Sequence, residues 1–258
     1  MGRPANELPP PHLAGGDTDI AAVGALVSDP GRCRILLALN DGRALPASRL
    51  AAEAGVSAAT ASSHLGKLTD AGLLTVEPHG RYRYYRLAGP AVGKLIETLQ
   101  QLAPVAPVRS LRQDIRARAL REARTCYDHV AGRLGVEILR AMIERGYVTG
   151  GDGSYDPEEA QSDHRTGFGH DVDYTITESG KAFLDEIGVR IPEHRRMIRY
   201  CIDWSEQRHH LSGALGRGVL DRLLELDWIR RTDVSRAVCI TEAGRRGLHD
   251  VLGIRVSA

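Results

Sequence analysis

Long hydrophobic segments and cysteines are both scarce in this chain of 258 residues. No run of 18 apolar residues occurs, which excludes a membrane-spanning helix. Residues 1–19 are polar and include a run of prolines, without the apolar core of a secretory signal. Four cysteines are too few for a disulfide scaffold. We therefore expect a cytoplasmic protein with no membrane partner.

Lysine is also scarce, because only three of the 34 basic residues are lysines and all the others are arginines. Arginine suits bidentate contacts with phosphate and base edges, although genomic base composition alone also produces such a bias. The 34 basic residues nearly balance 33 acidic ones, and the net charge is +1. This balance excludes a chain that is basic overall, but it leaves room for a local basic surface.

The order of polar and apolar segments divides the chain into three parts. Residues 1–19 are rich in proline and glycine and have little to bury, so we expect a disordered tail. Residues 20–107 contain short helical patterns and a hairpin, and residues 108–258 are mostly helical with hairpin-like strand pairs. We predict a mainly α fold with small β-hairpins: an N-terminal winged helix-turn-helix and a C-terminal duplicated, winged-helix-like helical domain.

Start and stop signals within residues 20–107 predict two helices joined by a tight turn. A short helical pattern over 49–54 precedes Gly55, which suits the turn, and Ser57 is a typical helix N-cap. In the next helix, predicted over 58–70, apolar residues recur at helical spacing and face a core. The other face of this helix is polar and carries Thr60, Ser62, Ser63, His64 and Lys67.

A two-stranded hairpin is predicted after this helix. Pro78-His79-Gly80 forms a turn between two alternating segments, and the second segment alternates arginine with tyrosine. In a winged helix-turn-helix, the second helix enters the major groove of DNA, where short polar side chains reach base edges. We therefore predict DNA contacts by Ser57 and the polar face of the helix, and by His79, Arg81 and Arg83 of the wing.

Residues 20–100 resemble the ArsR, or arsenical-resistance repressor, family of winged-helix transcription regulators. The segments that carry the resemblance are SDPGRCRIL at 28–36, LAAEAGVS at 50–57, TASSHL at 60–65, LTDAGLL at 68–74 and GRYRYYRL at 80–87. The resemblance implies a homodimer whose recognition helices enter successive major grooves of a near-palindromic operator. It also implies repression that a ligand relieves.

The usual metal sites of this family are missing from the resembling segment. Metal sensors of the family often have a Cys-x-Cys pair on the helix before the turn, but that helix reads SRLAAE here. Others use histidine and acidic ligands on the last helix, which here reads VGKLIETL and contains no histidine. Cys33 lies in an apolar stretch, where the expected role is that of a small core residue. We therefore expect the sensing site in the third part of the chain.

The third part begins with an arginine-rich helix and continues with an internal repeat. Residues 109–124 contain six arginines and two acidic residues, and we expect a solvated or internally paired face rather than a DNA contact. The repeats, near 126–188 and 201–253, align CYDH with CIDW, GRLG with GALG, and YTITESG with VCITEAG. Each copy is predicted as helix, hairpin and helix, and the first contains a long polar insertion over 150–171. We expect residues 108–258 to sense a ligand and to support the dimer.

The seam between the two copies is the expected place for a binding site. Predicted on a helix, Cys126 and His129 share one face at i, i+3 spacing. The candidates are Cys126, Asp128 and His129 in the first copy, and Cys201, Asp203, Trp204, His209 and His210 in the second. Thiolate and imidazole groups suit Zn(II), Cu(I) or As(III), whereas two thiols suit a redox switch. A third interpretation is that the cysteines only pack, with or without an organic ligand nearby.

Together these patterns predict a dimeric repressor that leaves its double-stranded DNA operator when the C-terminal domain binds a small molecule or a metal ion. The sequence identifies no particular cofactor. An enzyme would use Cys126 and His129 as nucleophile and base, but no orienting third group is evident, so we expect no enzyme. A winged helix used only for protein contacts would show no salt-dependent DNA binding.

Overall fold

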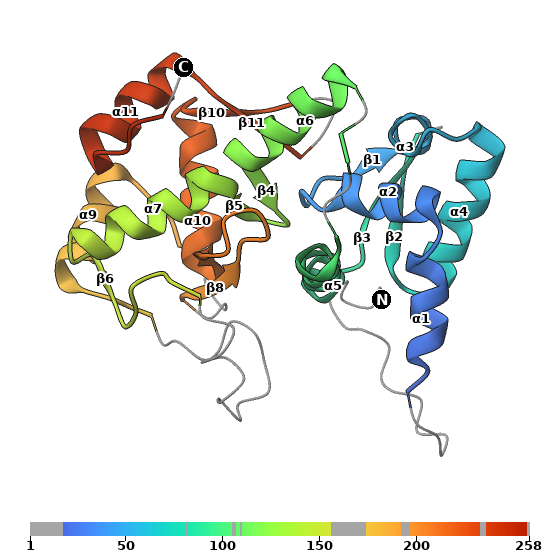
Figure 1. Ribbon diagram of the computed structural model, residues 1–258, viewed down its shortest axis with the longest axis horizontal. Coiled ribbons are helices and arrows are strands. Elements are labelled where there is room, and N and C mark those ends of the chain that lie inside the picture. Colours follow the sequence, from blue (N-terminus) through green and yellow to red (C-terminus); the bar gives the residue numbers. More distant parts are fainter. Residues whose placement is uncertain are drawn as a thin grey trace. The chain divides into compact units, whose positions relative to one another are not determined.

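The computed structural model describes residues 18–80, 82–104, 107–108, 110–155, 174–191, 197–232 and 236–256. The predicted tail 1–19 lies outside these ranges except for its last two residues, as does most of the predicted insertion 150–171. The chain forms two compact units, residues 1–100 and 101–258 (Figure 1). Within the described ranges, no helix combines the length and the hydropathy that a bilayer crossing requires.

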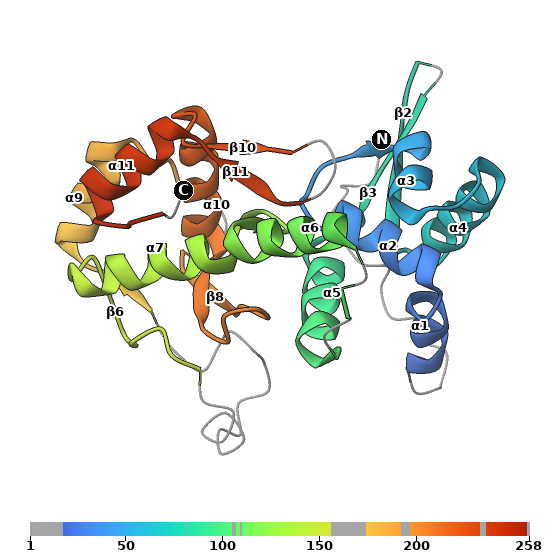
Figure 2. The same ribbon diagram turned by 45° about the horizontal axis from the view of Figure 1, so that its top comes forward.

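The N-terminal unit combines helices with a three-stranded antiparallel sheet. Its helices are α1 (Ile20–Val27), α2 (Pro30–Leu39), α3 (Ala47–Ala54), α4 (Ala58–Asp70) and α5 (Pro90–Leu102), the last of which continues into the next unit. Its strands are β1 (Leu45–Pro46), β2 (Leu74–His79) and β3 (Tyr82–Leu87), with β3 in the middle. Figure 2 shows β2 and β3 as a hairpin that projects beyond the helices of this unit.

Local signals in the sequence set the ends of these helices. Asp29 caps α2 by accepting a hydrogen bond from Arg32 N at 2.9 Å, and Pro30 occupies the first helical position. Cys33 on α2 is half-buried, and burial raises the pKa of its thiol. The apolar faces of α2 and α4 form the core, with Ile35, Leu36, Leu39, Ala61, Leu65 and Leu68 all buried. The predicted N-terminal winged helix-turn-helix is confirmed.

The C-terminal unit begins with α6 (Leu111–Glu122), and two copies of one order of elements follow. The first copy contains β4 (Arg124–Cys126), β5 (His129–Ala131), α7 (Gly132–Glu144), β6 (Val148–Thr149), β7 (Thr175–Ile176) and α9 (Glu178–Ile187). The second contains β8 (Arg199–Ile202), β9 (His209–Ser212), α10 (Gly213–Glu225), β10 (Ile229–Arg231), β11 (Val238–Ile240) and α11 (Glu242–Leu252). Each copy therefore begins with an antiparallel hairpin, where the sequence analysis wrongly placed a helix.

Equivalent backbone contacts connect the second hairpin of each copy to its last helix. Thr177 N donates to Tyr147 O at 3.0 Å, and Thr241 N donates to Trp228 O at 3.0 Å. The side chains of the same two threonines cap α9 and α11. The repeat in the sequence is therefore also a repeat in the structure.

The two copies interleave within a single core. Helix α7 of the first copy packs on β9 of the second, and α10 of the second packs on β5 of the first. Leu139, Leu215, Leu220 and Leu248 are fully buried members of this shared core. Burial of the apolar surface of either copy therefore depends on the other.

Candidate functional site

The turn between α3 and α4 depends on one residue with a left-handed backbone. Gly55 adopts φ 67° directly after α3, a conformation that costs glycine far less than other residues. Ser57 then caps α4 by accepting a hydrogen bond from Thr60 N at 3.2 Å. These two residues fix where α4 begins and leave its first turn exposed.

One face of α4 is exposed and polar. The exposed residues at and after its N-cap include Ser57, Thr60, Ser62, Ser63 and Lys67. The opposite face is buried in the core of the unit. Five of the six residues that the sequence analysis assigns to DNA on this helix are therefore accessible to a partner.

The sixth residue, His64, packs against α2 instead. Its side chain is 12% exposed, and its Nε2 lies 3.5 Å from Asp29 Oδ1. A Cβ at Gly31 would lie 2.8 Å from the same Nε2, so this glycine provides the space that the imidazole occupies. The position of His64 favours a packing role over the predicted contact with a base.

The hairpin of β2 and β3 forms the wing. His79 and Arg83 are exposed near its turn. Arg86 pairs with Glu77 on the neighbouring strand, with 3.1 Å between Nη2 and Oε2. Arg81 lies outside the described residues, so its DNA contact stays a prediction. The wing thus offers exposed cationic and polar groups near the turn end of the paired strands.

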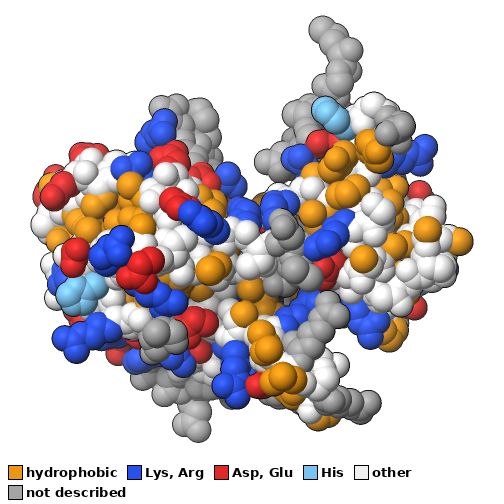
Figure 3. Space-filling model, turned by 90° about the horizontal axis from the view of Figure 1, so that it is seen from above, with side chains coloured by type: hydrophobic (Ala, Val, Ile, Leu, Met, Phe, Trp, Pro, Cys, Tyr) orange, Lys and Arg blue, Asp and Glu red, His pale blue; other side chains and the backbone are white. Residues whose placement is uncertain are grey.

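Helix α6 carries only part of the predicted arginine-rich helix. Arg118 pairs with Asp114 one turn away, with 2.9 Å between Nε and Oδ2, and Arg118 is exposed. Figure 3 shows basic and acidic side chains interspersed over the face that it displays. The helix ends at Glu122, however, and Arg124 lies on a strand with no exposed surface.

The first candidate pair lies across a hairpin, so its predicted placement on a helix is wrong. Cys126 ends β4 and His129 begins β5, and the two residues are directly opposite each other. Tyr127, in the two-residue turn between them, has φ 56°. Directly opposite residues of an antiparallel pair point to the same face. The thiol and the imidazole therefore still share one face, for a different structural reason.

The second copy places a thiol and an imidazole in the same way. Cys201 on β8 is directly opposite His210 on β9. The two hairpins bring these pairs together, since one ligand atom from each of Cys126, His129, Cys201 and His210 lies within 4.8 Å of the others. The Nε2 atoms of the two histidines are 3.2 Å apart. We call these four residues the Cys/His cluster.

Two glycines allow the halves of the Cys/His cluster to approach. A Cβ at Gly135 of α7 would lie 2.5 Å from a backbone carbonyl oxygen and 3.4 Å from His210 Cβ. A Cβ at Gly216 of α10 would lie 2.7 Å from a backbone carbonyl oxygen and 3.1 Å from His129 Cβ. Each glycine belongs to one copy and contacts the histidine of the other. The cluster therefore has approximate twofold symmetry.

Each histidine of the cluster has a carboxylate beside its second nitrogen. His129 Nδ1 lies 3.3 Å from Asp128 Oδ1, and His210 Nδ1 lies 3.6 Å from Asp203 Oδ2. Carboxylates in such positions orient the ring and favour the proton on Nδ1. In a neutral ring with this tautomer the lone pair is on Nε2, and the Nε2 atoms of the two rings face each other at 3.2 Å.

Asp203 belongs to a buried network that the sequence analysis missed in part. Its Oδ2 accepts hydrogen bonds from Arg124 Nη2 at 2.8 Å and from Gly132 N at 2.7 Å, and its Oδ1 accepts from Ser205 N at 2.9 Å. The Arg124 guanidinium lies over the ring of Trp204, 4.5 Å from the centroid. Burial opposes ionisation, but the Arg124 charge and these hydrogen bonds hold the pKa of Asp203 well below its ordinary value.

The thiol and imidazole groups of the cluster shift one another's protonation. A hydrogen bond from Cys126 lowers the pKa of the Cys201 thiol well below its usual value despite burial, and the positive charge of His129 adds to this effect. Burial opposes protonation of His129, but the Cys201 thiolate and the hydrogen bond to Asp128 raise the pKa of His129 to about 9. A thiolate and an imidazolium thus compensate each other's charge in the interior.

The remaining candidate histidine, His209, makes a separate set of contacts. Its Nδ1 lies 2.9 Å from the hydroxyl of Tyr174, and its ring is 4.1 Å from that of Tyr200 between centroids. Burial, together with the charge of His210, lowers the pKa of His209 to about 4. His209 is therefore neutral at neutral pH and packs beside the cluster.

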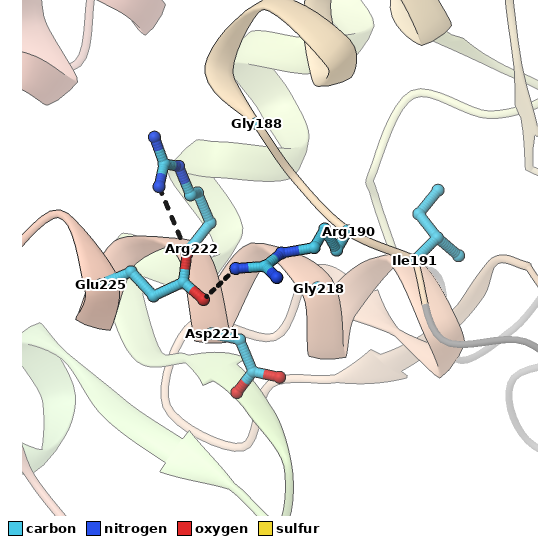
Figure 4. Close-up of a pocket in the computed structure, with 7 residues that line it drawn as sticks. All are labelled: Gly188, Arg190, Ile191, Gly218, Asp221, Arg222 and Glu225. Carbon is cyan, nitrogen blue, oxygen red and sulfur yellow. Dashed lines mark hydrogen bonds and ion pairs between the residues drawn. The ribbon is translucent and has the colours of Figure 1, made fainter.

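A surface pocket of about 280 Å³ lies elsewhere on the C-terminal unit (Figure 4). It is lined by Gly188, Arg190, Ile191, Gly218, Asp221, Arg222 and Glu225. Arg190 and Arg222 both pair with Glu225, at 3.0 and 3.2 Å. Because these charges compensate one another, and the pocket shares no residue with the Cys/His cluster, it is the weaker candidate for a ligand site.

Comparisons with known proteins match both units. A family model described as a helix-turn-helix domain matches residues 27–77. The uncharacterized HTH-type transcriptional regulator YdfF of Bacillus subtilis is 38% identical over 242 residues, which cover 92% of this chain and 99% of that protein. The HTH-type transcriptional regulator CmtR of Mycobacterium tuberculosis is 36% identical over 86 residues, or 33% of this chain and 72% of that protein. A solved structure of the cadmium metal-sensor CMTR from the same organism covers 35% of this chain and 95% of its own, at 36% identity and a TM-score of 0.28.

Proposed function

Since the chain belongs to the ArsR family of winged helix-turn-helix transcription regulators, in a form with an additional C-terminal region, we propose that it is a homodimeric repressor released from its operator by a ligand. The observation that carries this proposal is the exposed polar face of α4 beside the exposed wing. The ligand binds in the C-terminal unit, where the Cys/His cluster lies.

The DNA contacts divide between α4 and the wing. The N-terminal half of α4 enters the major groove, where hydroxyl groups of Thr60 and Ser63 reach base edges. Ser57, Ser62 and Lys67 contact phosphates or neighbouring bases. His79, Arg81 and Arg83 of the wing contact the backbone or the minor groove.

Exposed apolar side chains support a dimer of this chain. Ile20 on α1 is 78% exposed, and on α5 Leu99 is 39% and Leu102 is 79% exposed. Large apolar side chains that stay exposed in a single chain are often covered in subunit interfaces. Two copies with twofold symmetry present two α4 helices to a near-palindromic operator.

Release from the operator requires the ligand to bind the free and DNA-bound forms with different affinities. A coupling free energy of about 1–3 kcal/mol is typical, and it changes DNA affinity roughly 5- to 150-fold. A ligand in the C-terminal unit achieves this if it favours a dimer in which the two α4 helices no longer fit successive major grooves.

The direct test selects binding sequences from a random DNA library with the full-length protein. We expect a near-palindromic consensus whose affinity falls as salt concentration rises. Arg83→Ala should weaken binding to every sequence and reduce the salt slope by about 1. Arg86→Ala is the matched control on the same strand, because Arg86 is already paired with Glu77; its effect on the slope should be smaller.

Two outcomes contradict this proposal. If the protein enriches no DNA sequence and binds random duplexes without salt dependence, the winged helix serves another kind of partner. If the protein binds DNA as a monomer, measured by sedimentation of the complex, the symmetric dimer is wrong.

A further inference from the structure

Two buried thiols and two buried imidazoles meet where the copies of the C-terminal unit interleave. We propose that Cys126, His129, Cys201 and His210 together bind one Zn²⁺ ion in tetrahedral coordination, and that this ion is the ligand of the regulator. The metal site depends only on residues of the C-terminal unit, whereas the role of the ion as regulatory ligand rests on the proposed function.

The spacing of the donor atoms fits a tetrahedral zinc ion. Two nitrogens bound to such an ion at about 2.0–2.1 Å lie about 3.3 Å apart, and two thiolates at about 2.3 Å lie about 3.8 Å apart. The Nε2 atoms of His129 and His210 are 3.2 Å apart. All four donor atoms lie within 4.8 Å of one another, so small side-chain shifts bring every donor to zinc distance.

The surroundings of the two imidazoles also favour a cation between them. Asp128 and Asp203 lie beside the Nδ1 atoms of His129 and His210. A histidine that binds a metal through one ring nitrogen normally donates the N–H of the other to such a carboxylate. A cation that displaces the Nε2 proton of His129 would receive an Nε2 lone pair from each imidazole, because the two Nε2 atoms lie only 3.2 Å apart. His210 Nδ1 is buried without a hydrogen-bond partner, and a proton placed there by metal binding would point toward Asp203.

The cluster is closed, as sites that hold zinc without catalysis are. Cys126 is 2%, His129 4% and His210 0% exposed, and Cys201 is half-buried. Four protein donors fill the tetrahedral positions and leave none for a substrate. Two thiolates neutralise the charge of Zn²⁺, which reduces the cost of placing the ion in the interior. Neither a disulfide nor simple packing gives a role to the two histidines and their carboxylates.

Because the cluster is symmetric, a bound ion would connect the two copies of the repeat. Each copy supplies one thiol and one imidazole, from strands that face each other across its first hairpin. A bound ion therefore links the two copies. Asp203, beside His210, also holds Arg124, which donates to Leu120 O in the last turn of α6 at 3.1 Å. A change at the ion thus reaches α6, the helix that follows the DNA-binding unit in the sequence.

The first experiment measures metal binding by the full-length, reduced protein after removal of metal with a chelator. Elemental analysis and native mass spectrometry after addition of Zn²⁺ should give one ion per chain. Co²⁺ in place of Zn²⁺ should give the intense visible bands of tetrahedral cobalt and thiolate-to-cobalt charge transfer. These readouts need no variant, so they hold even where a substitution prevents folding. Fewer than one ion per chain, or a cobalt spectrum without thiolate bands, overturns the site.

Variants assign the ligands. Cys201→Ser and His210→Gln should each weaken Zn²⁺ binding more than 100-fold, and Asp128→Asn should weaken it about 10- to 100-fold through the orientation of His129. Cys239→Ser and His249→Gln are matched controls, because Cys239 and His249 are exposed on the same unit. Equal losses in the controls, or wild-type binding by Cys201→Ser, contradict the assignment. A disulfide between the two cluster cysteines that persists in reductant and excludes metal makes the thiols a redox pair instead.

The regulatory role is tested separately with DNA from the library selection. Metal-loaded protein should bind this DNA about 5- to 150-fold more weakly than metal-free protein. If one ion binds per chain and DNA affinity does not change, Zn²⁺ is not the regulatory ligand. If Zn²⁺ binds through these ligands and no DNA sequence is selected, the proposed function fails and the metal site stands.

Discussion

Replacement of Asp203 by asparagine should destabilise the C-terminal unit by about 3–5 kcal/mol, the usual cost of breaking a buried ion pair. The side chains of Asp203 and Arg124 are both 0% exposed, so the variant leaves a buried cation without its counter-charge. The amide also brings two N–H groups to a position where both carboxylate oxygens accept. One oxygen accepts from Arg124 and Gly132, and the other accepts from Ser205. Each buried donor that loses its acceptor adds roughly 1–3 kcal/mol.

Tryptophan fluorescence in a urea titration reports this loss for the C-terminal unit alone. Both tryptophans of the chain, Trp204 and Trp228, belong to this unit. A chelator in the buffer removes any contribution from bound metal. The matched control is Asp221→Asn, because Asp221 pairs with Arg217 at 2.7 Å on the surface, where the side chains are 42% and 41% exposed. The control should lose less than about 1 kcal/mol.

The result that refutes this reasoning is a loss in Asp203→Asn no greater than that of the control. A double variant distinguishes the effect of the two charges from the effect of the volume that the two side chains fill. When Arg124→Met and Asp203→Leu are combined, no buried charge remains unpaired, so the double variant should lose less stability than Asp203→Asn. Equal or larger loss in the double variant would show that shape, and not charge, decides the cost.

Three further predictions concern the repeat, the recognition helix and the dimer. In Gly244→Ala a Cβ would lie 2.0 Å from a backbone carbonyl oxygen, so thermal unfolding should show a loss of about 1–3 kcal/mol of stability. The control Gly24→Ala, where a Cβ meets nothing within 4 Å, should instead gain about 0.5–1 kcal/mol of stability. Equal effects of the two substitutions would contradict the close approach at Gly244. Thr60→Ala should change the DNA consensus in a library selection without changing the salt slope, and an unaltered consensus would argue against a base contact. Leu99→Glu should produce monomers in analytical ultracentrifugation, whereas Val76→Glu, with the same 39% exposure, should not; a persisting dimer would place the interface elsewhere.

Most of the N-terminal unit could be predicted from the sequence because its signals are local. Asp29 with Pro30 and Ser57 mark helix starts, and Gly55 supplies the left-handed residue of the turn. Apolar residues at helical spacing then fix which face of each helix is buried. His64 is the exception, because its packing against α2 depends on the space at Gly31, a contact between two helices.

The starts of the repeats could not be predicted correctly because long-range pairing determines them. The spacing of Cys126 and His129 fits one face of a helix as well as it fits a tight hairpin. Thr125 N donates to Arg236 O at 2.9 Å, so the hairpin is held by a residue far along the chain. Alignment of the two copies still matched Cys126 with Cys201, and the structure brings these two thiols together in the Cys/His cluster. Nothing local distinguishes the buried Arg124 from its exposed neighbours in the same arginine-rich run.

The interleaved packing of the two copies also bears on how this unit arose. A half-length chain with a single copy would expose the surfaces that α7 and α10 cover, unless a second half-length chain covered them. This packing is what a homodimer of short chains would retain after gene duplication and fusion. In such an ancestor, the Cys/His cluster would lie on the dimer axis, with one cysteine and one histidine from each subunit. After fusion, one half could accept the long insertion between β6 and β7 without imposing it on the other half.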